Sequence, residues 1–350
     1  MRKQILVVDD NIVSLKQVSA LLAGHYGFSL SRSGREALKF CEQEAPDLVL
    51  LDVEMPNMDG FETLAALKAI PGMAGVPVIF LTGNIDAATE IRALESGARD
   101  FIRKPADKDI LLHRVGFHLR LHDYQTNLEK TMKELERSIV VSFADLVECR
   151  DGNTGGHVLR TSRCVEIIGR RLLDKGLFSK ELSGKNLELM VRGAPFHDIG
   201  KIGISDVTLL KPGALTDREY DEVKRHTEIG ARILKNIYRR TPDQHYLEYA
   251  ALMAEGHHER YDGNGYPHGL RGEEIPLCSR LMAVANVYDA CLTDRAYRPA
   301  LSRDEACAVV VQGKGTEFDP CVVDAFLEVR EKLALLDESR ELLPGGVYNS

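Results

Sequence analysis

The sequence predicts two folded parts, a doubly wound α/β domain followed by an all-α domain, joined by a long helix. Three observations carry this prediction. Short apolar runs alternate with helical stretches over roughly the first 120 residues. Between about 108 and 150 the chain has no proline and one glycine, and beyond 150 helical periods continue without clear strands. A chain of 350 residues is long enough for two or three domains.

The α/β domain is predicted element by element. The runs 4–10 (QILVVDD), 47–53 (DLVLLDV) and 76–83 (VPVIFLTG) are apolar enough to be parallel strands that are buried on both faces. Segments 13–24, 34–43 and 60–70 carry apolar residues at helical spacing. This alternation predicts a parallel sheet covered by helices.

The long helix carries a heptad pattern. Its apolar residues are Leu121, Leu128, Met132, Leu135, Ile139 and Leu146. Such spacing predicts a coiled-coil seam, and therefore a homodimer paired through this helix, although Gln125 and Ser142 interrupt the seam. The alternative is a helix packed on its own domain.

Composition narrows the class of partner and compartment. With 45 basic and 53 acidic side chains the net charge is -8, which argues against direct DNA binding. Seven scattered cysteines fit reduced thiols in a cytosol. No stretch approaches the ~20 apolar residues of a membrane span. We therefore expect a soluble, cytoplasmic protein without a membrane partner.

Polar side chains gather where the predicted strands end. Asp9 and Asp10 end the first strand, Asp52 the second and Thr82 the third, while Lys104 follows the run DFIR. Ligands of open parallel sheets bind beyond the carboxyl ends of the strands. Neighbouring carboxylates need a hard cation such as Mg²⁺, and a lysine and a hydroxyl suit phosphoryl oxygens.

These residues carry a resemblance. The segment from 3 to about 122, with VVDD, LDVEMPNMDG, LTG and ARDFIRKP, resembles a response-regulator receiver domain of flavodoxin-like fold. The resemblance implies that Asp52 accepts phosphate from a sensor histidine kinase and that Asp10 helps to hold Mg²⁺. Thr82 and Lys104 would contact the phosphoryl group, and Phe101 would be an aromatic switch.

Histidines form a second constellation. Five histidines and one aspartate from four segments can make a closed metal shell: His157, His197, Asp198, His226, His257 and His258. Asp198, the only carboxylate, could bridge two ions, and Lys201, four residues after His197, is expected on the same helical face. Imidazole with carboxylate favours Fe, Mn or a similar metal. Protonation of the histidines in mild acid should strip the centre.

Residues from about 140 to 335 look like an HD-GYP domain, through RDGNTGGH, HDIGKIGI, HHERYDGNGYP and SRLMAVANVYDACLTDRAYR. The resemblance implies an all-α bundle that holds divalent ions, here two, and hydrolyses cyclic di-GMP to pGpG or GMP by means of a metal-activated water. The six residues above would be ligands, and Lys201 would act beside Asp198 in catalysis. Gly265 and Tyr266 would shape the substrate loop, and Arg295 and Arg298 would hold phosphate or guanine.

Two positions depart from the family pattern. Asn153 stands where a glutamate is usual and Asn286 where an aspartate ligand is usual; Asp289 could compensate but is more typical of a structural partner. The alternative function is therefore a catalytically weak or inactive domain that senses a cyclic dinucleotide or binds a protein. A mixed GMP-AMP substrate also stays open.

We therefore expect a receiver domain at 1–122, a helical linker at 123–145 and an HD-GYP domain at 146–340. Phosphorylation of the receiver would control hydrolysis by the second domain.

Overall fold

A computed structural model describes residues 2–83, 92, 95–150, 156–293 and 299–338. The chain divides into two compact units, Met1–Lys133 and Glu134–Ser350. None of the helices described is both long and apolar enough to cross a bilayer.

The first unit is built on a five-stranded parallel sheet, which confirms the predicted doubly wound class. The strands are β1 (Gln4–Val8), β2 (Gly27–Ser31), β3 (Leu48–Asp52), β4 (Val78–Thr82) and β5 (Asp100–Arg103), in the order β2-β1-β3-β4-β5. Every residue of β3 and β4 is buried, as their unbroken apolar sequences require. The order places the ends of β1 and β3 side by side, and with them Asp9 and Asp52.

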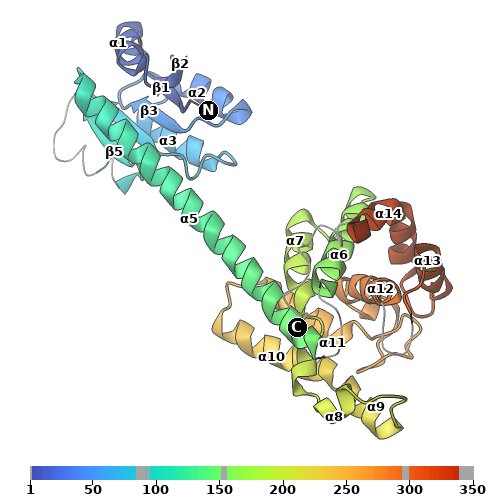
Figure 1. Cartoon of the computed structure of the whole chain (residues 1–350). Coiled ribbons are helices and arrows are strands. Elements are labelled where there is room, and N and C mark those ends of the chain that lie inside the picture. The colour runs from blue at the N-terminus through green and yellow to red at the C-terminus, as the bar shows by residue number, and fades with distance from the viewer. Residues whose placement is uncertain (1, 84–91, 93–94, 151–155, 294–298, 339–350) are drawn as a thin grey trace. The chain divides into compact units, whose positions relative to one another are not determined.

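Helices cover both faces of this sheet (Figure 1). They are α1 (Ile12–Leu22), α2 (Gly34–Gln43), α3 (Gly60–Ala69) and the beginning of α5 (Lys108–Cys149). One core joins α1 and α5 to the sheet, and the other joins α2 and α3 to its opposite face. Gly60 lets α3 approach the site, because a Cβ at this position would lie 2.4 Å from the carbonyl oxygen of Asp52.

The second unit is helical, as predicted. It contains α6 (His157–Asp174), α7 (Gly184–Gly193), α8 (Asp206–Leu209), α9 (Asp217–Lys224), α10 (His226–Arg240), α11 (Tyr246–Gly256), α12 (Leu277–Cys291), α13 (Arg303–Gln312) and α14 (Pro320–Glu338). Short 3₁₀ helices are η1 (Ala194–Phe196), η2 (Ile199–Gly203) and η3 (Gly272–Glu274). Within the described residues, its only β-type pairing is an isolated bridge between Lys314 and Phe318. The main core packs α6, α7 and α14 around α12, which is apolar on nearly every side.

The long helix α5 has two different faces. Near its end Ala144, Val147 and Glu148 are buried. The heptad face remains exposed, with relative exposures between 38% and 65% for Leu121, Leu128, Met132, Leu135, Ile139 and Leu146. The helix therefore packs through one face and leaves an apolar stripe uncovered on another.

Candidate phosphoacceptor and metal centres

The first candidate site lies at the carboxyl ends of the receiver strands. Asp9, Asp10 and Asp52 each offer an oxygen within 4.8 Å of the others. The ammonium group of Lys104 lies 2.6 Å from a carboxylate oxygen of Asp9 and 2.8 Å from one of Asp52. Thr82 is buried at the end of β4. The structure thus brings all five predicted residues to one edge of the sheet.

Burial and neighbouring charges have opposing effects on the pKa values of Asp52 and Lys104. Burial raises the pKa of Asp52, and the neighbouring Asp9 raises it further, while Lys104 opposes both effects. Burial alone would lower the pKa of Lys104, but hydrogen bonds to Asp52 and Asp9 outweigh it and leave that pKa raised. A carboxylate crowded in this way gains from a cation or from conversion to a phosphoryl group that Lys104 contacts.

The second candidate site is assembled from the ends of helices. His157 and His226 are the first residues of α6 and α10, and His257 directly follows α11. His197 and Asp198 lie between η1 and η2. Gly200 lets this turn reach α10, because a Cβ at that position would meet the carbonyl oxygen of His226 at 1.8 Å.

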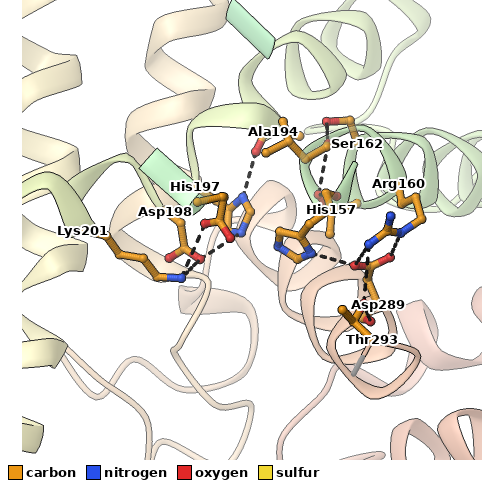
Figure 2. A network of polar contacts seen from close by, with 12 residues as sticks. His157, Arg160, Ser162, Ala194, His197, Asp198, Lys201, Asp289 and Thr293 are labelled. Atoms are coloured by element: carbon orange, nitrogen blue, oxygen red, sulfur yellow. Dashed lines mark hydrogen bonds and ion pairs between the residues drawn. The ribbon is translucent and has the colours of Figure 1, made fainter. Parts of the chain in front are cut away.

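The local geometry around Lys201 differs from the expectation. An α-helix would place Lys201 on the same face as His197, but the segment forms two 3₁₀ turns instead. With three residues per turn, positions i and i+3 share a face. Lys201 accordingly pairs with Asp198, at 2.8 Å, as Figure 2 shows.

Backbone and carboxylate groups fix the orientation of four imidazole rings. Nδ1 of His197 lies 3.1 Å from the carbonyl oxygen of Ala194, that of His226 lies 2.6 Å from Val223, and that of His257 lies 2.9 Å from Met253. Nδ1 of His157 lies 2.7 Å from a carboxylate oxygen of Asp289. A ring that donates through Nδ1 presents the lone pair of Nε2, which is the form that binds metals.

The inward-facing atoms are buried and unsatisfied. Nε2 of His197, Nε2 of His226, Nε2 of His257 and Oδ1 of Asp198 are buried without a hydrogen-bond partner. Buried polar atoms rarely remain unpaired, because each costs about 1–3 kcal/mol. Three ring nitrogens gathered around this carboxylate oxygen fit a metal centre, since all four atoms are acceptors with lone pairs aimed at shared space.

Two overlapping ligand groups can be recognised. One contains His157, His197 and Asp198, and the other contains Asp198, His226, His257 and His258. Within each group the ligand atoms lie within 4.8 Å of one another. Asp198 belongs to both groups, and its two oxygens face different histidines: Oδ2 is 3.4 Å from His197 and Oδ1 is 3.2 Å from His226. The two groups of candidate ligands therefore share one carboxylate.

Electrostatics keep this carboxylate ionised. Burial would raise the pKa of Asp198, but Lys201 and His197 hold it well below its usual range. Burial lowers the pKa of His257 to about 4 and also lowers that of His258. Burial acts in the same sense on His197, yet the attraction of Asp198 prevails and its pKa is raised. Two of the ligands are thus held neutral, and one binds protons more readily.

Three carboxylates just outside the ligand groups were not predicted as site residues. Glu148, buried at the end of α5, lies 3.5 Å from Nζ of Lys201. Asp289 contacts His157 and also accepts from Nε and Nη2 of Arg160 (Figure 2). Burial, and then Glu148, raise the pKa of nearby Asp145. These roles are hard to predict from the sequence, because they depend on how α5 and α12 pack.

The glycine-rich loop closes over the second ligand group. Buried Glu259 accepts hydrogen bonds from the backbone of His268 at 2.7 Å and Leu270 at 3.0 Å, and so fastens the loop. Tyr266 stacks on His258 with ring centroids 4.8 Å apart. Gly265 is required there, because a Cβ would lie 2.3 Å from the backbone nitrogen of Arg260. The adjacent acid in HHE was a signal for Glu259 that sequence reasoning passed over.

Other predicted residues fall elsewhere. Asn153, Arg295 and Arg298 lie outside the described residues. Asn286 is half-buried on α12.

Comparison with known proteins agrees with this arrangement. A family model described as a response regulator receiver domain matches residues 5–116, and one described as an HD domain matches residues 145–322. A Vibrio cholerae protein named probable cyclic di-GMP phosphodiesterase is 38% identical over 97% of this chain and 82% of its own. The Xanthomonas campestris cyclic di-GMP phosphodiesterase response regulator RpfG is 36% identical over 85% of this chain and 79% of its own.

A third relative, a Thermotoga maritima protein named cyclic di-GMP phosphodiesterase, is 32% identical over 94% of this chain and 90% of its own length. Both domain types and nearly the whole chain are thus shared with these relatives. The chain belongs to the response regulators in which a receiver domain is followed by an HD domain of the metal-dependent type.

Proposed function

We propose that this protein hydrolyses cyclic di-GMP under the control of phosphorylation at Asp52. The observation that carries the proposal is the set of four buried, unpartnered ligand atoms on His197, Asp198, His226 and His257. The names of three relatives that match most of the chain support the substrate.

The ligand set favours two divalent ions, most suitably Fe or Mn, because it combines imidazoles with one shared carboxylate and offers no thiolate. His157, His197 and Asp198 would hold one ion; Asp198, His226, His257 and His258 would hold the other. Bound ions would supply an activated water and would offset phosphate charge. The Asp9, Asp10 and Asp52 cluster would hold Mg²⁺ in the receiver.

The chain's own groups complete the chemistry. Lys201, held between Asp198 at 2.8 Å and Glu148 at 3.5 Å, would place a cation beside the phosphodiester as negative charge develops. Backbone carbonyls and Asp289 would keep the imidazoles in the ligating tautomer. The loop that contains Gly265 and Tyr266 would confine the substrate over the metal groups.

Helix α5 offers a route for control. It contributes Leu111 and Val115 to a core of the first unit. At its other end Glu148 approaches Lys201, and Arg150 donates to the carbonyl oxygens of Lys201, at 3.2 Å, and Ile204, at 3.1 Å. A change in α5 on phosphorylation would therefore act on the segment that carries Lys201.

The exposed heptad face of α5 supports a homodimer as the partner. Apolar residues at seven-residue spacing with exposures of 38% to 65% match the seam of a two-stranded coiled coil. Analytical ultracentrifugation should find a dimer, and the double variant Leu128→Lys with Leu135→Lys should sediment as a monomer. A monomeric wild type would refute the pairing.

A second candidate function is cyclic-dinucleotide sensing without turnover. It is favoured by Asn286, which carries no charge where the family pattern has an aspartate ligand, so that one carboxylate in the two ligand groups, already paired with Lys201, serves two ions. Glu148, Asp145 and Asp289 lie near enough to offset part of the cationic charge.

A single experiment separates the two functions. Protein loaded anaerobically with Fe or Mn is incubated with cyclic di-GMP, and pGpG and GMP are quantified by chromatography. Product formation that depends on added metal supports hydrolysis. Binding without product in every metal tried would replace hydrolysis by sensing. A parallel assay with the mixed GMP-AMP cyclic dinucleotide compares the two substrates.

A further inference from the structure

Helix α9 carries an exposed aromatic residue beside a half-buried cation. Tyr220 is 48% exposed, and Nζ of Lys224 lies 4.6 Å from the centre of its ring. The same Nζ lies 5.8 Å from the ring of Tyr266. One cation therefore lies within reach of two aromatic faces.

The position of α9 is set by polar contacts rather than by a core. None of its residues is buried, and its first turn is closed by a capping box between Thr216 and Glu219. Lys211 holds Glu219 at 2.6 Å, and Thr208 donates to Glu222 at 2.9 Å. These contacts hold the helix in place. Tyr220 belongs to no hydrophobic cluster, so core packing does not account for an aromatic side chain at this position.

The aromatic pair is linked to the metal groups. Tyr266 stacks on His258, with centroids 4.8 Å apart and planes inclined by 21°. His258 belongs to the ligand group that also contains Asp198, His226 and His257. Tyr266 therefore lies between this ligand group and the pair formed by Lys224 and Tyr220.

We propose that Tyr220, Lys224 and Tyr266 form a subsite for one purine base of the cyclic dinucleotide, an inference that rests on the proposed function. Purine bases stack on tyrosine rings, and a neighbouring cation strengthens aromatic recognition and attracts the phosphodiester. Asp221, which pairs with Lys224 at 2.9 Å, is itself largely exposed and leaves the cation at the surface. Stacking of this kind does not require hydrogen bonds to the edge of the base.

Steady-state kinetics on two substrates test the subsite. Cyclic di-GMP carries two purine bases, whereas bis(p-nitrophenyl) phosphate carries a phosphodiester with two small nitrophenyl rings and no purine. Replacing Tyr220 by Ala should lower the ratio of kcat/KM for cyclic di-GMP to that for the small diester by about tenfold, through KM, as expected for the loss of one stacking contact. Tyr220→Phe, which keeps the ring, should retain the ratio.

The control is Tyr238→Ala, in α10, twelve residues and therefore roughly 18 Å along the helix from His226. It should leave the ratio unchanged. An unchanged ratio in Tyr220→Ala, or an equal loss in Tyr220→Phe, would overturn the subsite. Failure of the wild type to hydrolyse either substrate would instead overturn the proposed hydrolysis, and a binding measurement then decides the subsite.

The binding measurement uses the absence of tryptophan from this chain. In the metal-loaded Tyr220→Trp variant, added cyclic di-GMP should stack on the new indole and quench its fluorescence in a saturable manner, whereas orthophosphate should not. The Tyr238→Trp variant should show no saturable quenching. Equal responses of the two variants, or none at position 220, would contradict the assignment.

Discussion

Asp289 and His157 are joined by a hydrogen bond of 2.7 Å between a carboxylate oxygen and Nδ1. Arg160 donates to both oxygens of the same carboxylate (Figure 2). Such an outer carboxylate fixes the tautomer of a ligating imidazole and increases its basicity. Asp289 is thus a partner of a candidate ligand, one turn after Asn286 on α12.

The Asp289→Ala variant should therefore bind the ion held by His157, His197 and Asp198 about 10- to 100-fold more weakly. Asp289→Asn, which keeps an acceptor but no charge, should fall between Ala and wild type. Equilibrium titration against a competing chelator measures both, and circular dichroism checks that the variants are folded. Equal metal affinity in Ala and wild type would show that Asp289 serves the fold alone.

Lys201 should affect the rate without affecting the metal. Lys201→Met removes a cation 2.8 Å from Asp198, and the loss of one charge-stabilising donor typically costs about 10²–10³ in kcat. Metal content by elemental analysis should stay at the wild-type value. Lys175→Met, which removes a surface partner of Glu328, is the matched control and should retain kcat. Loss of metal in Lys201→Met would reassign this lysine to assembly of the centre.

Acid should release the two ions in sequence. The pKa of His197 is raised by Asp198, so protons compete with metal there as the pH falls toward 5.5. Burial lowers the pKa of His257 to about 4, so His257 stays deprotonated at the same pH. Ordinary histidines would lead us to expect that mild acid releases all of the bound metal. The opposite pKa shifts of His197 and His257 instead predict that the two ions are lost one after the other.

Elemental analysis after dialysis tests this order. Protein loaded at pH 7.5 should hold two ions per chain and, after dialysis at pH 5.5, close to one. The His157→Ala variant, dialysed in the same way, should keep the ion held by Asp198, His226, His257 and His258. Simultaneous loss of both ions over this pH range would contradict the assignment of His197 as the ligand that protons displace first.

Phosphorylation should act through Asp52. A small phosphoryl donor such as acetyl phosphate is expected to change the rate of cyclic di-GMP hydrolysis by the wild type, and Asp52→Asn should abolish the change while keeping the unstimulated rate. Lys104, 2.8 Å from Asp52, would supply the contact to the phosphoryl group. A response that survives in Asp52→Asn would place the control elsewhere in the chain.

The class of each unit followed from sequence because periodicity records burial directly. β3 and β4 are buried at every residue, and their unbroken apolar runs predicted them. β2 was not predicted, because as an edge strand it alternates exposed and partly buried residues and reads GFSLS. Likewise, the short β5 begins with Asp100 and ends with Arg103, which hides its strand character.

The site was predictable where the sequence contains unusual pairs of potential ligands, such as the adjacent His257 and His258. It was not predictable where distant helices meet. Glu148 on α5 and Asp289 on α12 reach Lys201 and His157 only after packing. The 3₁₀ geometry that pairs Lys201 with Asp198 was also hidden, because helix type in so short a segment depends on close contact between Gly200 and α10.

The central claim is that Asp198 is shared by two metal ions, and metal titration of an Asp198→Ala variant tests it most directly. The wild type should bind two Mn²⁺ per chain, and the variant should lose both, because Asp198 belongs to both ligand groups. A His258→Ala variant, altered in one group only, should retain at least one ion. An Asp198→Ala protein that still binds two ions with wild-type affinity would contradict the claim.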